Sequence, residues 1–137
     1  MRYLGIDVGR ARIGLAIADG LLRTARPLQV VVRRGDVPDL AAIAEVAAEY
    51  EVTQAVVGLP LHMDGSEGPS AAFARRFAGK LADALQVPVA FQDERLSTFE
   101  AESRMRDRGL SARERRPLVD AEAAAVILQD WLDGSSE

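Results

Sequence analysis

Residues 4–19 read LGIDVGRARIGLAIAD, a stretch in which one carboxylate, Asp7, interrupts an apolar and glycine-rich pattern. The alternation of side chains predicts two strands, Arg2–Val8 and Arg12–Ala18, joined as a hairpin. A carboxylate inside a core strand is unfavourable by several kcal/mol unless it is paired or binds a metal. Asp7 is therefore the first candidate site residue.

The glycines near Asp7 favour a site. Gly5 lies on the same strand face as Asp7, and Gly5 and Gly9 carry no side chain, so a metal or a phosphate has room to approach. The alternative is that Asp7 only caps the turn that follows, as aspartates often do at strand ends. Two more carboxylates in unusual positions favour the first interpretation.

The pattern after the hairpin predicts an α/β fold. The expected elements are a strand, a helix capped by Asp36, a buried strand, a helix and a further strand: Pro27–Val32, 36–50, Gln54–Val57, Pro69–Leu85 and Val87–Phe91. A strand, a helix and a strand in this order indicate parallel pairing. The polar segment Leu61–Gly68 predicts an exposed, mobile loop at the carboxyl ends of the strands, where such sheets bind ligands.

The second unusual carboxylate lies in Gln92-Asp93-Glu94-Arg95, directly after a predicted strand. Neighbouring side chains of a strand point to opposite sides, so only one of the two acids can face a shared site, and we choose Glu94. The alternative is that either acid leads into the helix expected at Ser97–Asp107, with Glu100 completing a capping box.

The third carboxylate, Asp120, lies at the start of the last predicted helix, which begins near Pro117. It shares the spacing of an apolar stripe and therefore faces the protein; the stripe consists of Ala123, Ala124, Ile127, Leu128 and Trp131. An N-cap role would also explain an early aspartate, but Pro117 and the inward register favour a site residue.

The composition restricts the metals that could bind. The chain has no cysteine and one histidine, His62, which excludes thiolate sites and multi-histidine zinc sites. Oxygen ligands favour magnesium, manganese or calcium. The length of 137 residues predicts a single domain, 1–137, and neither a membrane span nor a cationic leader is evident, so we expect a cytoplasmic protein.

Charge is segregated along the chain despite a net charge of −4. Residues 1–35 carry seven arginines and two acids, and residues 95–116 carry seven arginines and four acids, whereas 36–51 and 117–137 are acidic. A basic surface rich in arginine suits phosphate groups. The alternative is a general preference for arginine, since Lys80 is the one lysine among 17 basic residues.

Three converging carboxylates would form an oxygen-only site for one or two divalent ions. Two such ions can activate a water and stabilise the leaving oxygen in phosphodiester hydrolysis, so the protein needs acids alone to hold them. Carboxylates crowded together repel one another, which raises their pKa values until ions bind.

Four ordered motifs carry a resemblance that covers the whole chain: GIDVGRARIGLAIAD, VVGLPLHMDGSEGPSA, DERLST and DAEAAAVILQDWL. Together they resemble the YqgF/RuvX family, relatives of the RuvC Holliday-junction resolvases in the ribonuclease H-like superfamily. The resemblance implies a mixed five-stranded sheet, antiparallel in its first three strands and parallel afterwards, flanked by helices. It also implies a nuclease dependent on Mg²⁺ or Mn²⁺ that matures the 5′ end of the pre-16S ribosomal RNA, with a further role on branched DNA.

Carried over by position, the resemblance implies metal binding and catalysis by Asp7, Glu94 and Asp120, with Asp93 as a further metal ligand. The phosphate partners would be Arg10, Arg12, Arg95 and the basic connector Arg113, Arg115 and Arg116. His62 stands where the family more often has asparagine, so we expect a loop histidine near the site. Structured RNA, or branched DNA, is the expected partner of a monomer or homodimer.

Two rival interpretations remain. Actin-like ATPases and sugar kinases open with a similar GIDVG pattern, but they need two such domains around a nucleotide, and this chain has room for one. A non-catalytic module that binds RNA through its arginines is the other rival. The presence of all three acids argues against it.

Overall fold

The structure, a computed structural model, describes residues 1–95 and 97–134. Its five strands are β1 (Arg2–Val8), β2 (Arg12–Asp19), β3 (Arg26–Val32), β4 (Gln54–Leu59) and β5 (Val89–Asp93). They form one sheet in the order β3-β2-β1-β4-β5. The β1–β2 and β2–β3 pairs are antiparallel, whereas β1–β4 and β4–β5 are parallel. The predicted mixed sheet is confirmed.

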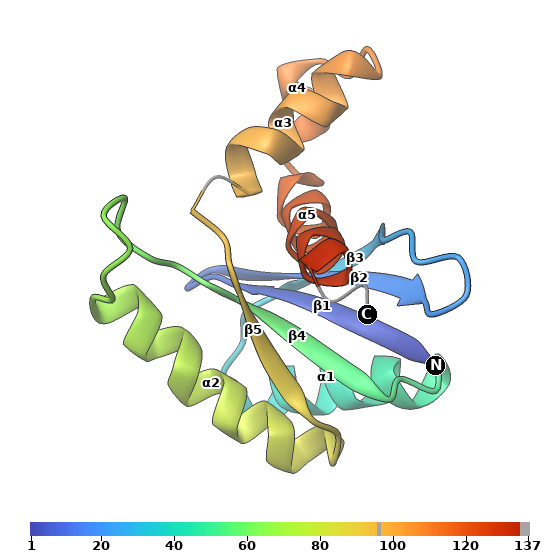
Figure 1. Ribbon diagram of the computed structural model, residues 1–137, viewed down its shortest axis with the longest axis vertical. Helices are drawn as coiled ribbons and strands as arrows, with labels where there is room; N and C mark the ends of the chain where they lie inside the picture. The colour runs from blue at the N-terminus through green and yellow to red at the C-terminus, as the bar shows by residue number, and fades with distance from the viewer. Residues whose placement is uncertain (96, 135–137) are drawn as a thin grey trace.

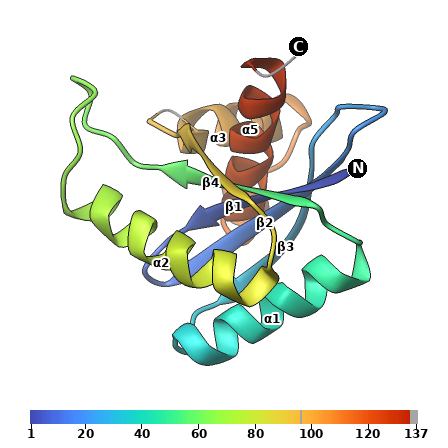
Figure 2. The ribbon, with the colours of Figure 1, turned by 60° about the horizontal axis from the view of Figure 1, so that its bottom comes forward.

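Helices cover both faces of this sheet. On one face lie α1 (Asp36–Glu49) and α2 (Pro69–Leu85), and on the other α5 (Val119–Gly134), as Figures 1 and 2 show. The helix α3 (Ser97–Asp107) packs on α5, and the short α4 (Ala112–Arg115) follows it. None of the helices in the described part of the chain has the length and apolar character that crossing a membrane requires.

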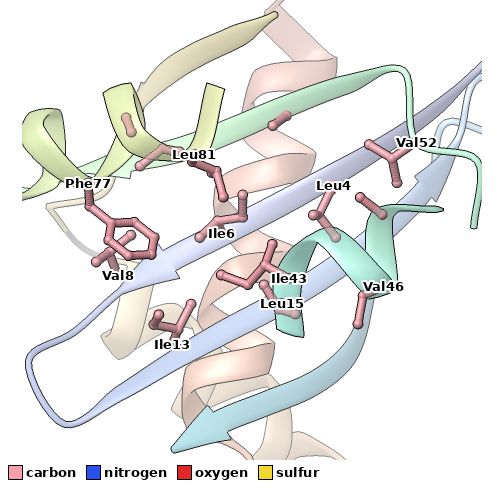
Figure 3. Packing of buried hydrophobic residues seen from close by; sticks show 14 of the residues in the cluster. Leu4, Ile6, Val8, Ile13, Leu15, Ile43, Val46, Val52, Phe77 and Leu81 are labelled. Atoms are coloured by element: carbon pink, nitrogen blue, oxygen red, sulfur yellow. The ribbon is translucent and has the colours of Figure 1, made fainter. Parts of the chain in front are cut away.

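The two faces of the sheet bury different kinds of side chain. Leu4 and Ile6 of β1 pack with Ile43 of α1 and with Phe77 and Leu81 of α2 in the larger core (Figure 3). The opposite face carries small residues, and α5 lies close to the sheet there.

Gly5 serves this close packing. A Cβ at Gly5 would lie 2.7 Å from the Cβ of Leu128 on α5 and 2.8 Å from the backbone oxygen of Ala124. The prediction that Gly5 leaves room for a ligand is therefore wrong, because the helix fills that space. Gly9 closes the β1–β2 turn, where its N–H donates to the carbonyl of Arg12 at 2.9 Å.

Two element boundaries differ from the prediction in ways that matter for the site. Strand β5 begins at Val89, opposite Ala55, and extends to Asp93, opposite Leu59, so the acids follow the sheet directly. Leu96 of the DERLST motif lies outside the described residues. The basic connector contains α4, because Ser111 and Glu114 form a capping box. The three-residue spacing of a serine and a glutamate is typical of such a box.

A buried ion pair fixes the junction between β3 and α1. Asp39 is fully buried, and its Oδ2 accepts from Nε of Arg33 at 2.8 Å, while its carboxylate also accepts from the backbone N–H groups of Arg34 and Gly35. Asp36 was predicted to be the N-cap, but Gly35 occupies that position. Asp36 instead pairs with both Arg33 and Lys80 of α2.

Candidate active site

Asp7 lies at the carboxyl end of β1, on the face that α5 covers. Its neighbour across β2 is Gly14. On β4, Val57 is opposite Ile6, so Gly58 is the next residue beside Asp7. The residues beside Asp7 on both neighbouring strands are thus glycines, Gly14 and Gly58.

These two glycines make room for the other acids. A Cβ at Gly14 would lie 1.9 Å from the backbone oxygen of Asp120, and a Cβ at Gly58 would lie 2.5 Å from Oε1 of Glu94. The bare backbone that the site requires is therefore on the neighbouring strands. Sequence reasoning missed both residues, because their alignment with Asp7 depends on strand register.

Glu94 turns its side chain towards Asp7. The two carboxyl groups share a hydrogen bond, in which Glu94 is the protonated partner. Burial and the charge of Asp120 raise the pKa of Asp7, and the hydrogen bond with Glu94 lowers it. The resulting pKa is about 6. Burial and the nearby Asp7 carboxylate raise the pKa of Glu94 to about 8. Glu94 thus faces the site, and Glu100, which was expected to complete a capping box at the start of α3, pairs with Arg104 at 3.2 Å.

Asp120 enters the site from the first turn of α5. Its Oδ2 accepts a hydrogen bond from Nε of Arg12 at 2.7 Å, and this ion pair links α5 to the start of β2. The charge of Asp120 raises the pKa of Asp7, so the two carboxylates lie close enough to repel. The inward register predicted for the last helix agrees with the burial of Ala123, Ala124, Ile127 and Leu128.

Asp93 has a different partner. Its Oδ2 accepts from Nε of Arg95 at 2.8 Å, and its Oδ1 accepts from the backbone N–H of Arg95 at 2.9 Å. The Arg95 guanidinium also donates to the carbonyl of Met63 at 2.9 Å. Asp93 thus ties the end of β5 to the 61–68 loop, while Glu94 turns to Asp7.

The donor set at Asp7 suits a hard cation, because it consists of carboxylate oxygens only. Within residues 1–95 and 97–134, however, no three Asp, Glu or His side chains are already arranged around one point to hold an ion. In the structure Asp7 and Glu94 are hydrogen-bonded to each other, and Asp120 is paired with Arg12. The three acids would hold an ion only once these contacts had changed.

The 61–68 loop is exposed, as predicted, but it has internal structure. Leu61 and Glu67 form an antiparallel bridge, the N–H of His62 donates to Ser66, and Gly65 closes the turn with φ +90°. The ring of His62 is exposed and lies against Gly68, whose Cβ would be 2.4 Å from Nε2. His62 stays a loop residue with no contact to the carboxylates in the interactions that the structure describes.

Comparison with known proteins decides the family. The model of a family described as "RuvX: Holliday junction resolvase" matches residues 1–134. The chain belongs to the RuvX family. A relative in Anaeromyxobacter dehalogenans (strain 2CP-C), named "Putative pre-16S rRNA nuclease", is 71% identical over 133 residues and 97% of each chain. A relative of the same name in Myxococcus xanthus (strain DK1622) is 50% identical, over 97% of this chain and 88% of its own.

Solved structures show that the RuvX chain shares the RuvC fold. RuvC of T. thermophilus in complex with a Holliday junction substrate has a TM-score of 0.65 at 21% identity and covers 99% of this chain and 96% of its own. The Fowlpox virus resolvase has a TM-score of 0.60 at 10% identity over the full length of both chains. A ROK family protein from Streptococcus pneumoniae has a TM-score of 0.50 at 15% identity, over 74% of this chain and 37% of its own.

The arginines predicted to contact phosphate in this RuvX chain fall into two groups. Arg12 and Arg95 are already paired with Asp120 and Asp93, and Nη1 of Arg115 donates to the carbonyl of Leu110 at 2.8 Å. The remaining three make no such pair in the described part of the chain: Arg113 and Arg116 are exposed, and Arg10 stacks on an aromatic ring. Their contact with phosphate stays a prediction.

The raised pKa values of Asp7 and Glu94 predict that the RuvX chain without divalent ions loses stability as pH rises. The folded state keeps these two protons up to about pH 6 and about pH 8, whereas the unfolded chain releases them near pH 4. Ionisation therefore favours unfolding, and the free energy of unfolding falls by several kcal/mol between about pH 4 and 8. Melting temperatures in EDTA across this range will measure the effect.

Mg²⁺ should reverse this loss, and more strongly at pH 8 than at pH 5, because ion binding must release protons from the site. The Asp7→Asn variant is the matched comparison, since it removes one of the two ionisations. A variant with the same pH profile as the parent chain would show that other groups cause the fall.

Proposed function

We propose that this protein is a nuclease that hydrolyses phosphodiester bonds with one or two Mg²⁺ or Mn²⁺ ions, and that pre-16S ribosomal RNA is its substrate. The observation that supports the proposal is that Gly14 and Gly58, the strand neighbours of Asp7, lie against Asp120 and Glu94. Its relatives named as pre-16S rRNA nucleases, 71% identical over nearly the whole chain, support the choice of substrate.

Asp7, Glu94 and Asp120 are the residues that would hold the ions. Asp93 is the fourth acid at the site, and its ion pair with Arg95 makes it the weaker candidate ligand. Bound divalent ions would supply a nucleophilic water and stabilise the leaving oxygen of the phosphodiester. This chemistry needs no nucleophilic side chain, which fits a chain without cysteine.

The chain's own residues prepare the site for this charge. Asp7 and Glu94 are partly buried, which strengthens their attraction to cations. Arg12 holds Asp120 at the edge of the site, where the side chain of Arg12 is half exposed. Released from Asp120, the Arg12 guanidinium would be available to a phosphate oxygen, which suits its planar fork.

A second candidate substrate is a Holliday junction. The family description and the fold of RuvC in complex with such a junction favour it. A junction has two-fold symmetry, so this function would require a homodimer, whereas RNA processing allows a monomer. Action on ribosomal RNA precursors would place the protein in the cytoplasm.

Cleavage assays with matched substrates test the proposal. We expect the purified chain to cut a pre-16S rRNA fragment in Mg²⁺ or Mn²⁺ and to be inactive in EDTA. Faster cleavage of a four-way DNA junction than of the RNA would favour the resolvase function. If the chain bound both substrates but cut neither of them with either ion, the non-catalytic binding module would be favoured. If it hydrolysed ATP and cut neither substrate, the kinase-like interpretation would be favoured.

A further inference from the structure

A cavity lies beyond the β1–β2 turn, and Asp7, Glu94 and Asp120 do not line it. Its volume is about 260 Å³, and it is lined by Arg10, Arg33, Gly35 and Phe73. These residues come from the β1–β2 turn, the β3–α1 junction and the first turns of α2. The cavity therefore forms where three segments that are distant in sequence meet.

Arg10 differs from the other arginines of this region in how it is held. Its guanidinium carbon lies 4.5 Å from the centre of the Phe73 ring, and no carboxylate in residues 1–95 and 97–134 pairs with it. A ring restrains a guanidinium by a cation–π contact but leaves its charge in place. Arg10 is therefore positioned and still able to attract an anion, unlike Arg12 and Arg95.

Arg33 forms the fixed wall of the cavity. Its guanidinium donates to Asp39, to Asp36 and to the carbonyl of Gly9, and it stacks on Phe77 at 5.1 Å. Three of its five N–H groups are used in this way. Because Gly9 belongs to the turn that carries Arg10, the buried Arg33 also sets the position of that turn.

Of the two arginines that line the cavity, Arg33 is paired with carboxylates and Arg10 is not, in the part of the chain that the structure describes. Arg33 and Lys80 balance Asp36 and Asp39 through the ion pairs that connect them, and Arg10 adds one unpaired charge. A phosphodiester group carries one negative charge. The cavity thus matches a phosphodiester better than a dianionic phosphate monoester.

The position of the cavity relates it to the carboxylate site. Arg10 is three residues beyond Asp7, so their Cα atoms are at most about 11 Å apart. Phe73 packs on the side of the sheet that α1 and α2 cover, whereas Asp7 faces α5. A strand that reaches both Asp7 and the cavity would therefore pass over the β1–β2 turn.

We propose that the cavity of Arg10, Arg33, Gly35 and Phe73 binds one phosphodiester group of the substrate strand, beside the bond that is cut. This subsite rests on the proposed nuclease function for its role in cleavage, but binding alone reveals it. Arg10 supplies the charge, Phe73 orients Arg10, and Arg33 fixes the wall.

Binding of a fluorescent single-stranded 12-nucleotide RNA to the full chain, in EDTA, tests the subsite. We expect Arg10→Gln to weaken binding about fivefold or more and to reduce the slope of log K against log salt by about 0.7, the value for one phosphate contact. Phe73→Leu should weaken binding with Arg10 still present. Arg26→Gln is the matched control, because Arg26 is exposed at the opposite end of the sheet.

Hydrolysis of bis(p-nitrophenyl) phosphate, which is too short to reach the cavity, separates the subsite from catalysis. Arg10→Gln should slow cleavage of the 12-nucleotide RNA by a larger factor than it slows this hydrolysis. A parent chain that cuts neither substrate would contradict the nuclease function but not the binding result. Equal effects of Arg10→Gln and Arg26→Gln on affinity and salt slope would overturn the subsite.

Discussion

Replacement of Asp7 by asparagine is expected to abolish cleavage, with turnover reduced about 10³-fold or more, because the central ligand of the proposed ion site is lost. Asparagine has nearly the same shape and still accepts a hydrogen bond from Glu94. The variant should therefore fold, and at pH 8 it should melt no lower than the parent chain, since a buried ionisation has been removed.

Asp83→Asn is the matched control for this change. It makes the same acid-to-amide replacement at an exposed position of α2, and it should retain full turnover. If Asp7→Asn cleaved as fast as Asp83→Asn, Asp7 would not be a catalytic residue. Asp93→Asn completes the set, because a comparable loss there would assign a ligand role to Asp93.

Substitution of Gly14 by alanine is expected to destabilise the fold by about 3 kcal/mol or more, because the added methyl group has no space. Its Cβ would lie 1.9 Å from the backbone oxygen of Asp120, so the start of α5 must move away from β2. Asp120 and its pair with Arg12 would move with it. Urea denaturation will measure the stability, and cleavage at a temperature where the variant is folded will measure the effect on the site.

Gly79→Ala provides the comparison for Gly14→Ala. Gly79 lies in α2 with no atom within 4 Å of its added Cβ, so alanine should stabilise the chain by about 0.5–1 kcal/mol through helix propensity. A Gly14→Ala chain as stable as the parent would contradict the close contact between α5 and the sheet.

Local periodicity was sufficient to predict the strands and the inward direction of Asp120, whereas the full pairing of the mixed sheet came from the family resemblance. The helix period of the last segment places residue 120 on the same side as Ile127 and Leu128, and this geometry depends on no other part of the chain. The alternation of β1 likewise placed Asp7 opposite the Leu4 and Ile6 face, and the structure agrees.

Long-range pairs could not be predicted in this way. Arg12 and Asp120 are 108 positions apart in sequence, and their ion pair depends on how α5 docks. Gly14 and Gly58 matter only because strand register aligns them with Asp7. The pair of the buried Glu122 with the exposed Arg108, which joins α5 to the residue after α3, was missed for the same reason.

Anomalous diffraction from crystals grown with Mn²⁺ at pH 8 tests most directly whether the three carboxylates form an ion site. We expect a manganese peak about 2.0–2.4 Å from carboxylate oxygens of Asp7, Glu94 and Asp120, with Arg12 released from Asp120. A structure in which Glu94 still shares its proton with Asp7, and in which manganese is absent or bound elsewhere, would contradict this account.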